Sequence, residues 1–567
     1  MPYRAPVRDV RFILDHVAGF PALTATPRFA EATPEMVEAI LTEAGRIATD
    51  VLAPLNRSGD LHPARLENGV VISSPGFASG YRALAEGGWI GMAAHPDHGG
   101  MGLPMALATA VDDMVSGACL ALQIKSVLTK GQIEALEHHA SDAIKALYLP
   151  KLTSGEWSGT MNLTEPQAGT DLAALRTKAE PNGDGTYAIS GQKIYISWGD
   201  SDLVANVCHL VLARLPDGSE GTKGISLFMV PKVIPDADGN LGARNSLRVI
   251  SLEHKLGIHG SPTCVMQYDG ATGWLVGEPH RGMAAMFTMM NNARLSVGVQ
   301  GVGVAEAAMQ HALAYAADRH QGPTPLSDTG AIIDHADVRR MLATMRAEIF
   351  AARSIALSCG VAMDMATATG SADWRARAAL LTPIAKAYGT DTGYDVAGLG
   401  IQIHGGMGFV EETGAAQFLR DVRITTIYEG TNGIQAMDLV GRKLSDGGEA
   451  AFRLIDEVQR AAEAARDRLP DLAGDVWQAS EALRETTEAL LAKPLNDRFA
   501  GAVPYLRGFA RVLGGHAHLT AALADPARLP LTRFMIRRLL PEHQSLFAAA
   551  REGAEGLYAL TPEDLAA

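Results

Sequence analysis

The hydrophobic pattern of the chain changes its period twice, and these changes constrain the fold more than any other feature. From Arg8 to Glu156 the apolar residues recur with helical spacing. Residues 158–280 instead hold short or alternating apolar runs separated by Gly, Pro, Asp and Asn, a pattern typical of β-strands joined by turns. Helical periodicity returns at Met283. The sequence therefore predicts a mainly α-helical protein with a central β-domain: a helical bundle, a β-barrel-like domain and a four-helix bundle.

The length of the chain also predicts several domains. A chain of 567 residues exceeds what one hydrophobic core usually supports. Leu444–Glu449 (LSDGGE) is a candidate linker, and the sequence beyond it is again helical and rich in Ala, Leu and Arg. We expect an N-terminal helical domain at 1–157, a middle β-domain at 158–281, a helical bundle at 282–445 and a C-terminal helical extension at 446–567.

Charge and cysteine content exclude several classes of protein. A net charge of −14 argues against a nucleic-acid-binding protein, which normally has a basic face. The four cysteines are far apart and form no metal-binding pattern, which is typical of a reducing compartment. The N-terminal segment carries Asp9 and Asp15 and lacks a long apolar core, so it predicts neither a signal peptide nor a membrane span. We expect a cytoplasmic protein.

One stretch, Ile401–Lys443, combines features that suggest chemistry. Its apolar run Val422–Tyr428 has a strand-like pattern and leads directly to Glu429, followed by Gly430, Thr431 and Asn432. An adjacent apolar run would desolvate this carboxylate and raise its pKa, which would make it a base usable near neutral pH. The structural alternative is a capping segment that opens a helix at Gly433–Arg442, because Thr and Asn are favoured caps. These residues alone leave both interpretations open.

Three motifs in this order resemble the acyl-CoA dehydrogenase family. They are LTEPQAGTD at Leu163–Asp171, GGMGF at Gly405–Phe409, and RDVRITTIYEGTNGIQ at residues 420–435. The resemblance runs from the N-terminus to about Lys443. The remaining helical segment is similar to the extension found in a larger bacterial branch of the family.

The resemblance implies an oxidoreductase that dehydrogenates an acyl-CoA thioester to the trans-2-enoyl-CoA. In the family, the Glu of IYEGT removes the α proton while the β hydrogen leaves as hydride to N5 of FAD, so Glu429 is the expected base. The second place where the family can carry this acid is Ala293 here, which leaves Glu429 as the matching candidate. Arg294 is expected to position Glu429 or the substrate. The expected electron acceptor is electron-transfer flavoprotein.

The resemblance also implies the FAD contacts. Residues expected near the flavin are Leu163, Thr164, Gly169, Thr170, Tyr195, Ser197 and Thr431. Arg319, Gln402, Gly405 and Gly406 match elements that reach the adenine and pyrophosphate of FAD in a neighbouring subunit. The expected assembly is therefore a homodimer or larger. If this motif stood alone, a core strand with an edge Tyr and Ser would be the better explanation of Tyr195 and Ser197.

Alternatives to the dehydrogenase remain at this point. An acyl-CoA oxidase would share the fold and differ in oxygen access, and a catalytically silent flavoprotein or assembly partner would use the helical extension for binding. Neither the length of the acyl chain nor a thioether in it is evident from the sequence. The glycines Gly298, Gly301 and Gly303 do not match the dinucleotide-binding spacing, and we expect them to allow close helix packing.

Overall fold

The computed structural model describes residues 3–567, apart from the side chain at position 291. The chain forms two compact units. The bundle unit contains the residues up to Gly45, Pro104–Gly117 and Arg294–Ala567, and the barrel unit contains Arg46–Leu103 and Ala118–Ala293. Two long helices, α6 (Met105–His139, kinked at Cys119) and α8 (Gly282–Asp318), contribute residues to both units.

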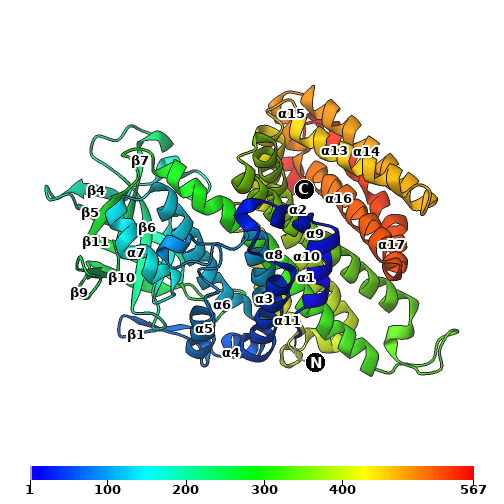
Figure 1. The fold of residues 1–567 in the computed structure, drawn as a ribbon, viewed down its shortest axis with the longest axis horizontal. Coiled ribbons are helices and arrows are strands. Elements are labelled where there is room, and N and C mark those ends of the chain that lie inside the picture. The colour runs from blue at the N-terminus through cyan, green and yellow to red at the C-terminus, as the bar shows by residue number, and fades with distance from the viewer. Residues whose placement is uncertain (1–2) are drawn as a thin grey trace. The chain divides into compact units, whose positions relative to one another are not determined.

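The barrel unit is built around a seven-stranded sheet that closes on itself (Figure 1). Five strands form the ring in the order β11, β5, β4, β6, β7 and back to β11, while β10 pairs with β11 and β3 with β6. Hydrophobic side chains such as Val211, Phe228 and Met266 form its core. The elements of this unit are α4 (Ala53–Leu61), β1 (Arg65–Glu67), β2 (Val70–Ile72), α5 (Phe77–Glu86), α7 (Asp142–Thr153), β3 (Trp157–Asn162), β4 (Lys178–Pro181), β5 (Tyr187–Ser197), β6 (Asn206–Arg214), β7 (Ile225–Pro231), β8 (Val233–Pro235), β9 (Leu241–Arg244), β10 (Leu247–Leu252) and β11 (Thr263–Val276).

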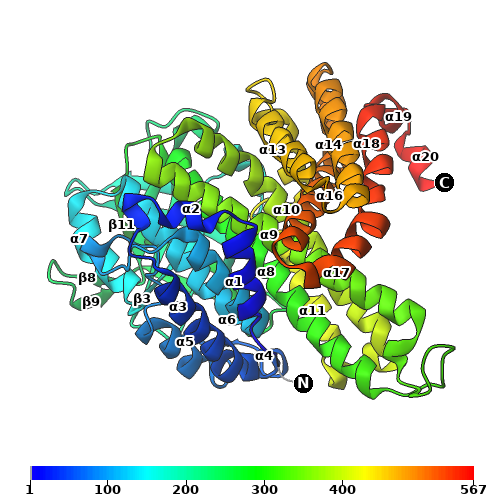
Figure 2. The ribbon, with the colours of Figure 1, turned by 45° about the vertical axis from the view of Figure 1, so that its right-hand side comes forward.

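The bundle unit consists of helices, and the helices that follow residue 446 pack within it (Figure 2). Helices α13, α14, α16 and α18 share one hydrophobic core with α8, α9 and α10. The helices of this unit, besides those shared, are α1 (Val7–His16), α2 (Phe20–Thr24), α3 (Pro34–Arg46), α9 (Ala336–Thr369), α10 (Ala372–His404), α11 (Ala415–Val422), α12 (Asn432–Asp438), α13 (Glu449–Ala465), α14 (Pro470–Leu491), α15 (Leu495–Ala500), α16 (Ala502–Ala524), α17 (Leu529–Phe534), α18 (His543–Glu552), α19 (Glu555–Tyr558) and α20 (Pro562–Ala566).

This architecture confirms the predicted fold class, a mainly α-helical protein with a barrel-like β-domain in the middle of the sequence. The four-domain division stays a prediction, since the two compact units divide the chain differently. The prediction of a strand-like run at Val422–Tyr428 is wrong. Helix α11 ends at Val422, and a 3-10 turn follows at Arg423–Thr426. Threonine hydroxyls favour the turn, because Thr425 Oγ1 donates to the Val422 carbonyl at 2.7 Å and Thr426 Oγ1 to the Arg423 carbonyl at 3.1 Å.

Helices α8 and α10 approach each other closely at two of the glycines noted in the sequence, while the third, Gly303, faces α6, where a Cβ would lie 2.3 Å from the Asp113 carbonyl oxygen. A Cβ atom at Gly301 would lie 2.3 Å from the Gly389 carbonyl oxygen, and one at Gly298 would lie 2.7 Å from the Ala385 carbonyl oxygen. Any larger side chain would push the two backbones apart. The expectation that these glycines allow close helix packing is confirmed, and the contact fixes α8 against α10.

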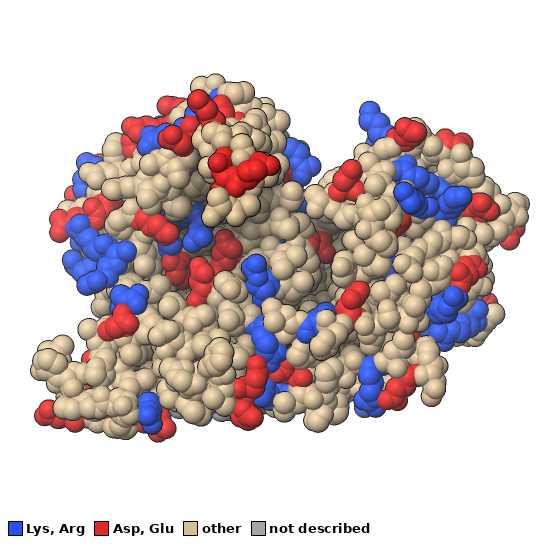
Figure 3. Space-filling view, turned by 180° about the vertical axis from the view of Figure 1, so that it is seen from behind, with Lys and Arg blue, Asp and Glu red and all other residues tan. Residues whose placement is uncertain are grey.

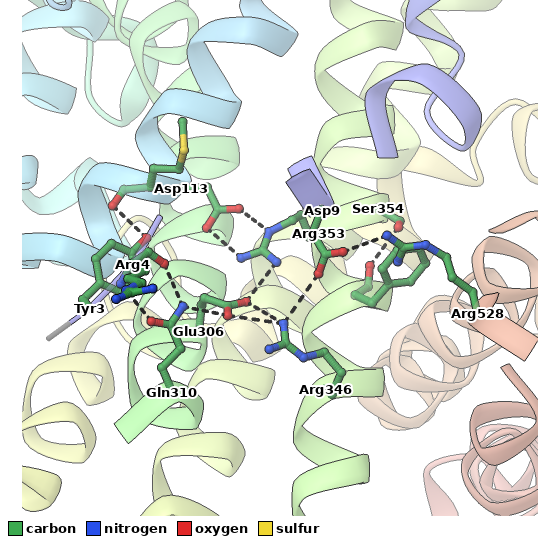
Figure 4. Close-up of polar contacts among 12 residues, drawn as sticks. Tyr3, Arg4, Asp9, Asp113, Glu306, Gln310, Arg346, Arg353, Ser354 and Arg528 are labelled. Atoms are coloured by element: carbon green, nitrogen blue, oxygen red, sulfur yellow. Dashed lines mark hydrogen bonds and ion pairs between the residues drawn. The ribbon is translucent and has the colours of Figure 1, made fainter. Parts of the chain in front are cut away.

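A set of buried and half-buried ion pairs joins five segments of the bundle unit (Figure 4). We call it the Arg353 cluster; its members are Asp9, Asp113, Glu306, Arg346, Arg353 and Arg528. Arg353 Nε donates to Asp113 Oδ2 at 2.6 Å, and its Nη1 donates to Glu306 Oε2 at 3.1 Å. Arg528, in the C-terminal extension, donates from Nη2 to Asp9 Oδ1 at 2.8 Å. The cluster therefore connects the extension to the first helix.

Two helices, Met105–His139 and Ala336–Thr369, are long and apolar enough to cross a membrane. In their most apolar windows, 94% and 83% of the residues are buried by other parts of the protein, so both are explained as core helices. Acidic and basic side chains are interspersed on the face shown in Figure 3, and neither sign forms a continuous surface there. Within residues 3–567, no group of three His, Cys, Asp or Glu side chains is placed to hold a metal ion.

Candidate active site

Glu429 lies in the tight connection between the Arg423–Thr426 turn and α12. Its backbone is left-handed, with φ of 56°, a conformation that costs a non-glycine residue roughly 1–3 kcal/mol. The side-chain amide of Gln435 stabilises this turn by donating to the carbonyls of Glu429 and Gly430, both at 3.2 Å. Thr431 then caps α12, because its hydroxyl accepts from the Ile434 N–H. The capping interpretation therefore holds for Thr431, while the catalytic interpretation of Glu429 stays a prediction.

The carboxyl group of Glu429 is half-buried and lacks a close partner. Among the described residues, it forms no hydrogen bond and no ion pair within 4.0 Å. Burial raises the pKa of Glu429 to about 7, although Arg294 and Lys386 each act to lower it. Burial outweighs the two cations because neither is close enough to hydrogen-bond to the carboxylate. Glu429 is therefore poised to change its charge near neutral pH.

Arg294 is buried on α8, and the acid nearest to it is Asp438. Its Nη1 lies 3.6 Å from Asp438 Oδ2, while Asp438 also accepts from Arg442 Nε at 2.5 Å. Burial lowers the pKa of Arg294, against the opposing effects of Asp438 and Glu429. Arg294 thus acts on Glu429 by charge at longer range, while Asp438 holds its guanidinium in place.

Lys386 is a completely buried lysine on α10 that was not predicted from the sequence. Its Nζ donates to Asn432 Oδ1 at 2.9 Å, three residues beyond Glu429. Burial lowers the pKa of Lys386 to about 7, while Glu429 and Asp391 act to raise it. The only signal in the sequence was a single lysine within the apolar run from Leu380 to Tyr388, which does not reveal its partner.

Close packing of α8 against α10 explains why Arg294 and Lys386 both lie near Glu429. Lys386 directly follows Ala385, whose carbonyl oxygen meets Gly298, and Arg294 lies one helical turn before that glycine. The glycine contact therefore sets the position of both cations relative to Glu429.

The barrel unit contains the group of residues expected near the flavin. The loop that begins at Leu163 is fixed to β5, because the Thr164 carbonyl accepts from the Ile194 N–H at 3.0 Å. A buried pair missed in the sequence strengthens this connection: Lys193 Nζ donates to Glu165 Oε1 at 2.8 Å and to the Leu163 carbonyl at 2.9 Å. Lys193 and the other partners of Glu165 outweigh burial and hold the pKa of Glu165 at about 2.

This group fits a planar, polar-edged ring system. Tyr195 has a left-handed backbone, with φ of 61°, and 62% of its side chain is exposed on a strand whose neighbouring Ile196 is buried. Neither the hydroxyl of Thr164 nor that of Ser197 has a hydrogen-bond partner among residues 3–567. Gly169 and Thr170 are exposed, and no atom lies within 4 Å of a Cβ placed on Gly169. An exposed aromatic face and unpaired hydroxyls are what a flavin needs for stacking and for hydrogen bonds to its edge.

A third group lies at the far ends of α8 and α10. The rings of Tyr315 and His404 stack there at 4.4 Å, which brings Arg319 and Gln402 to the same end of the bundle unit. The residues of this group, Arg319, Gln402, Gly405 and Gly406, are all exposed. Lys386 and His404 are 18 residues apart on α10, which is about 27 Å along a helix. The group is therefore remote from Glu429, whereas the exposed Thr431 lies beside it and uses its hydroxyl as the cap of α12.

Comparison with known proteins covers nearly the whole chain. Models of the acyl-CoA dehydrogenase family match the N-terminal domain at residues 35–156, the middle domain at 160–271 and the C-terminal domain at 280–444. A fourth model, acetyl-CoA dehydrogenase C-terminal like, matches residues 454–561.

Individual relatives agree with the family models. The chain is 45% identical to 3-methylmercaptopropionyl-CoA dehydrogenase of Ruegeria pomeroyi, over 93% of this chain and 92% of that one. It is 33% identical to the broad-specificity linear acyl-CoA dehydrogenase FadE5 of Mycobacterium tuberculosis, over 93% and 85%. The fold is similar to an acyl-CoA dehydrogenase complexed with FAD from Bacillus anthracis, with a TM-score of 0.75, 21% identity and coverage of 99% and 93%. Together with the motifs around Leu163 and Glu429, these matches show that the chain belongs to the acyl-CoA dehydrogenase family and is an FAD-dependent oxidoreductase that acts on acyl-CoA.

Proposed function

We propose that Glu429 is the base that removes the α proton of an acyl-CoA thioester. The observation that carries this proposal is the state of its carboxyl group: half-buried, without a hydrogen-bonded partner, and with a pKa of about 7. At and above that pH the carboxylate can accept a proton, and no competing donor within the described chain occupies it.

The surrounding residues supply orientation and electrostatics for this proton transfer. The left-handed turn at Glu429 is fixed by Gln435, so the carboxylate has a defined direction. The backbone N–H of Glu429 has no acceptor among the described residues and is available to polarise the thioester carbonyl. Bound FAD supplies the acceptor for the β hydrogen as hydride. Tyr195, Ser197 and Thr164 are the residues that would hold its ring.

A short acyl-CoA with a thioether in its acyl chain is the substrate that we propose. This rests on the high identity to 3-methylmercaptopropionyl-CoA dehydrogenase over almost the full length of both chains. The similarity to a broad-specificity linear enzyme is lower and makes straight-chain acyl-CoAs the alternative. A panel of thioether, straight and branched acyl-CoAs, compared by kcat/KM, separates these two. A preference for a long straight chain would contradict the thioether assignment.

Electron-transfer flavoprotein is the proposed electron acceptor, and a homodimer is the proposed assembly. The dimer is supported by the group of Arg319, Gln402, Gly405 and Gly406, which is exposed and remote from Glu429. Re-oxidation distinguishes the dehydrogenase from the oxidase: slow re-oxidation by air and fast re-oxidation by electron-transfer flavoprotein support the proposal, and fast re-oxidation by air contradicts it.

Anaerobic bleaching of the flavin tests the role of Glu429. The FAD-loaded protein should lose its visible flavin absorbance when an acyl-CoA substrate is added. Glu429→Gln should retain FAD and bind the acyl-CoA but should not bleach. Bleaching of the Gln variant at the wild-type rate would refute the assignment of the base.

A further inference from the structure

We infer that Lys386 is a positioning residue whose buried positive charge favours the ionised form of Glu429. This inference rests on the proposed role of Glu429 as the base. It goes beyond that role because it identifies a residue that, together with Arg294, lowers the pH at which the base is available. Lys386 acts through Glu429 and needs no contact with substrate.

Asn432 holds Lys386 in place at the start of α12. Its Oδ1 accepts from Lys386 Nζ at 2.9 Å, and its Nδ2 donates to Asp391 Oδ1 at 2.7 Å and to Thr390 Oγ1 at 3.0 Å. Lys386, Thr390 and Asp391 all lie on α10, so Asn432 connects the turn that carries Glu429 to this helix. A lysine with one neutral hydrogen-bond acceptor and no salt bridge within 4.0 Å is an expensive group to bury. A nearby negative charge reduces the free-energy cost of burying Lys386, and Glu429 is the acid that acts on Lys386 most strongly.

The other charges around the pair belong to two groups. Arg294 forms an ion pair with Asp438, which also pairs with Arg442 and Lys443. Within the described chain, Asp391 forms no ion pair within 4.0 Å, and burial raises its pKa against the hydrogen bond from Asn432 and the charges of Arg507, Lys386 and Arg423. Glu429 and Lys386 also have no opposite charge at contact distance among the described residues, and of the two acids near Lys386, Glu429 acts on it more strongly than Asp391. The titrations of Glu429 and Lys386 are therefore coupled at longer range.

The coupling has a consequence that simple packing would not have. A positive Lys386 favours the ionised form of Glu429, which makes the base available at lower pH but also makes it weaker. Removing the charge should raise the pH at which the base becomes available and leave the rate above that pH undiminished. A variant that only disturbed the packing would lower the rate at every pH.

The test is the pH profile of anaerobic bleaching by acyl-CoA in the FAD-loaded enzyme. Lys386→Met should move the midpoint upward by about one pH unit, so that bleaching near pH 7 becomes roughly five-fold slower while the high-pH plateau is retained. Lys386→Gln removes the charge but can still donate to Asn432, and should shift the midpoint equally. It provides the same test if the Met variant fails to fold. Lys386→Arg should restore a midpoint near that of the wild type.

Lys443→Met is the matched control. It removes one lysine charge close to the same turn, but the acid that Lys443 faces is Asp438, at 3.9 Å. We expect its midpoint to stay near the wild-type value. An equal shift in this control would show a general effect of net charge and would overturn the inference, as would an unchanged midpoint in both neutral Lys386 variants.

A second readout does not depend on turnover. The protonated carboxyl of Glu429 has an infrared carbonyl band that can be assigned by subtracting the spectrum of Glu429→Gln. The pH at which this band disappears should rise in Lys386→Met without any acyl-CoA present. If the wild type fails to bleach, the proposed function is wrong, yet this titration still decides the inference. An unchanged band midpoint in Lys386→Met overturns it.

Discussion

The bundle unit contains two groups of buried charges that have opposite properties. In the Arg353 cluster, Asp113 and Glu306 both lie within hydrogen-bond distance of one guanidinium. Arg346 and Arg353 outweigh the effect of burial and hold the pKa of Glu306 below its ordinary value. At Glu429 the cations are farther away, burial prevails, and the pKa rises to about 7. For these two glutamates, the distance to the cations separates a lowered pKa from a raised one. At Asp113, by contrast, burial raises the pKa although Arg353 donates to it at 2.6 Å.

The largest expected effect is on the chemistry at Glu429. Glu429→Gln keeps the shape of the side chain but cannot accept a proton, so we expect the rate of anaerobic bleaching to fall by about 100- to 10,000-fold. Glu306→Gln is the matched substitution in the Arg353 cluster and should leave the rate of bleaching in the folded protein near that of the wild type. Equal losses of rate in the two variants would remove the distinction between the two groups.

The second effect is on stability. Arg353→Met leaves Asp113 and Glu306 buried without their shared cation, so the free energy of unfolding should fall by about 3–5 kcal/mol. Urea denaturation at neutral pH measures it. Arg339→Met breaks an exposed ion pair with Asp334 and serves as the control, with an expected loss of about 0–1 kcal/mol. If Arg353→Met lowered the free energy of unfolding by no more than Arg339→Met does, the Arg353 cluster would contribute little to the stability of the fold.

Glu429→Gln should change stability in the opposite direction. The pKa of Glu429 is raised from the ordinary value of 4.5 to about 7 in the folded protein. Its contribution to the free energy of unfolding is therefore fully present below pH 4.5 and is lost as the pH rises through about 7. The Gln variant should therefore gain stability relative to the wild type between these values, reaching about 1–3 kcal/mol above pH 7. Denaturation of both proteins at low and high pH measures the difference. A variant that is less stable than the wild type at high pH would mean that Glu429 is well paired after all.

The smallest effect sharpens the role of the barrel unit. Tyr195→Ala removes the exposed ring on β5, and we expect about ten-fold weaker FAD binding with little change in the free energy of unfolding of the apoprotein. Tyr187→Ala, on the same strand but packed edge-on against Phe228, should instead lower stability. FAD titration of the two apoproteins checks both expectations, and unchanged affinity in Tyr195→Ala would contradict the stacking role.

The sequence was sufficient for the fold class and for proposing Glu429 as the base, but not for the electrostatics around Glu429. The switch between helical and strand periodicity is a local property, and the motif around Glu429 lies within a few consecutive residues. Lys386, by contrast, acts across 43 positions of sequence, and nothing in its neighbours indicates that it faces Asn432. Asp438 as the partner of Arg294 was hidden for the same reason. The composition of Arg423–Thr426 favours a strand because it is rich in β-branched residues, whereas the hydroxyls of Thr425 and Thr426 donate to preceding carbonyls and favour a turn.

The infrared titration of the Glu429 carboxyl in the wild-type protein, without substrate, tests the central claim most directly. We predict a protonated carbonyl band that is absent from Glu429→Gln and disappears with a midpoint near pH 7. A midpoint near 4.5, the value of an ordinary glutamate, would contradict the claim that burial without a close partner makes this residue a base.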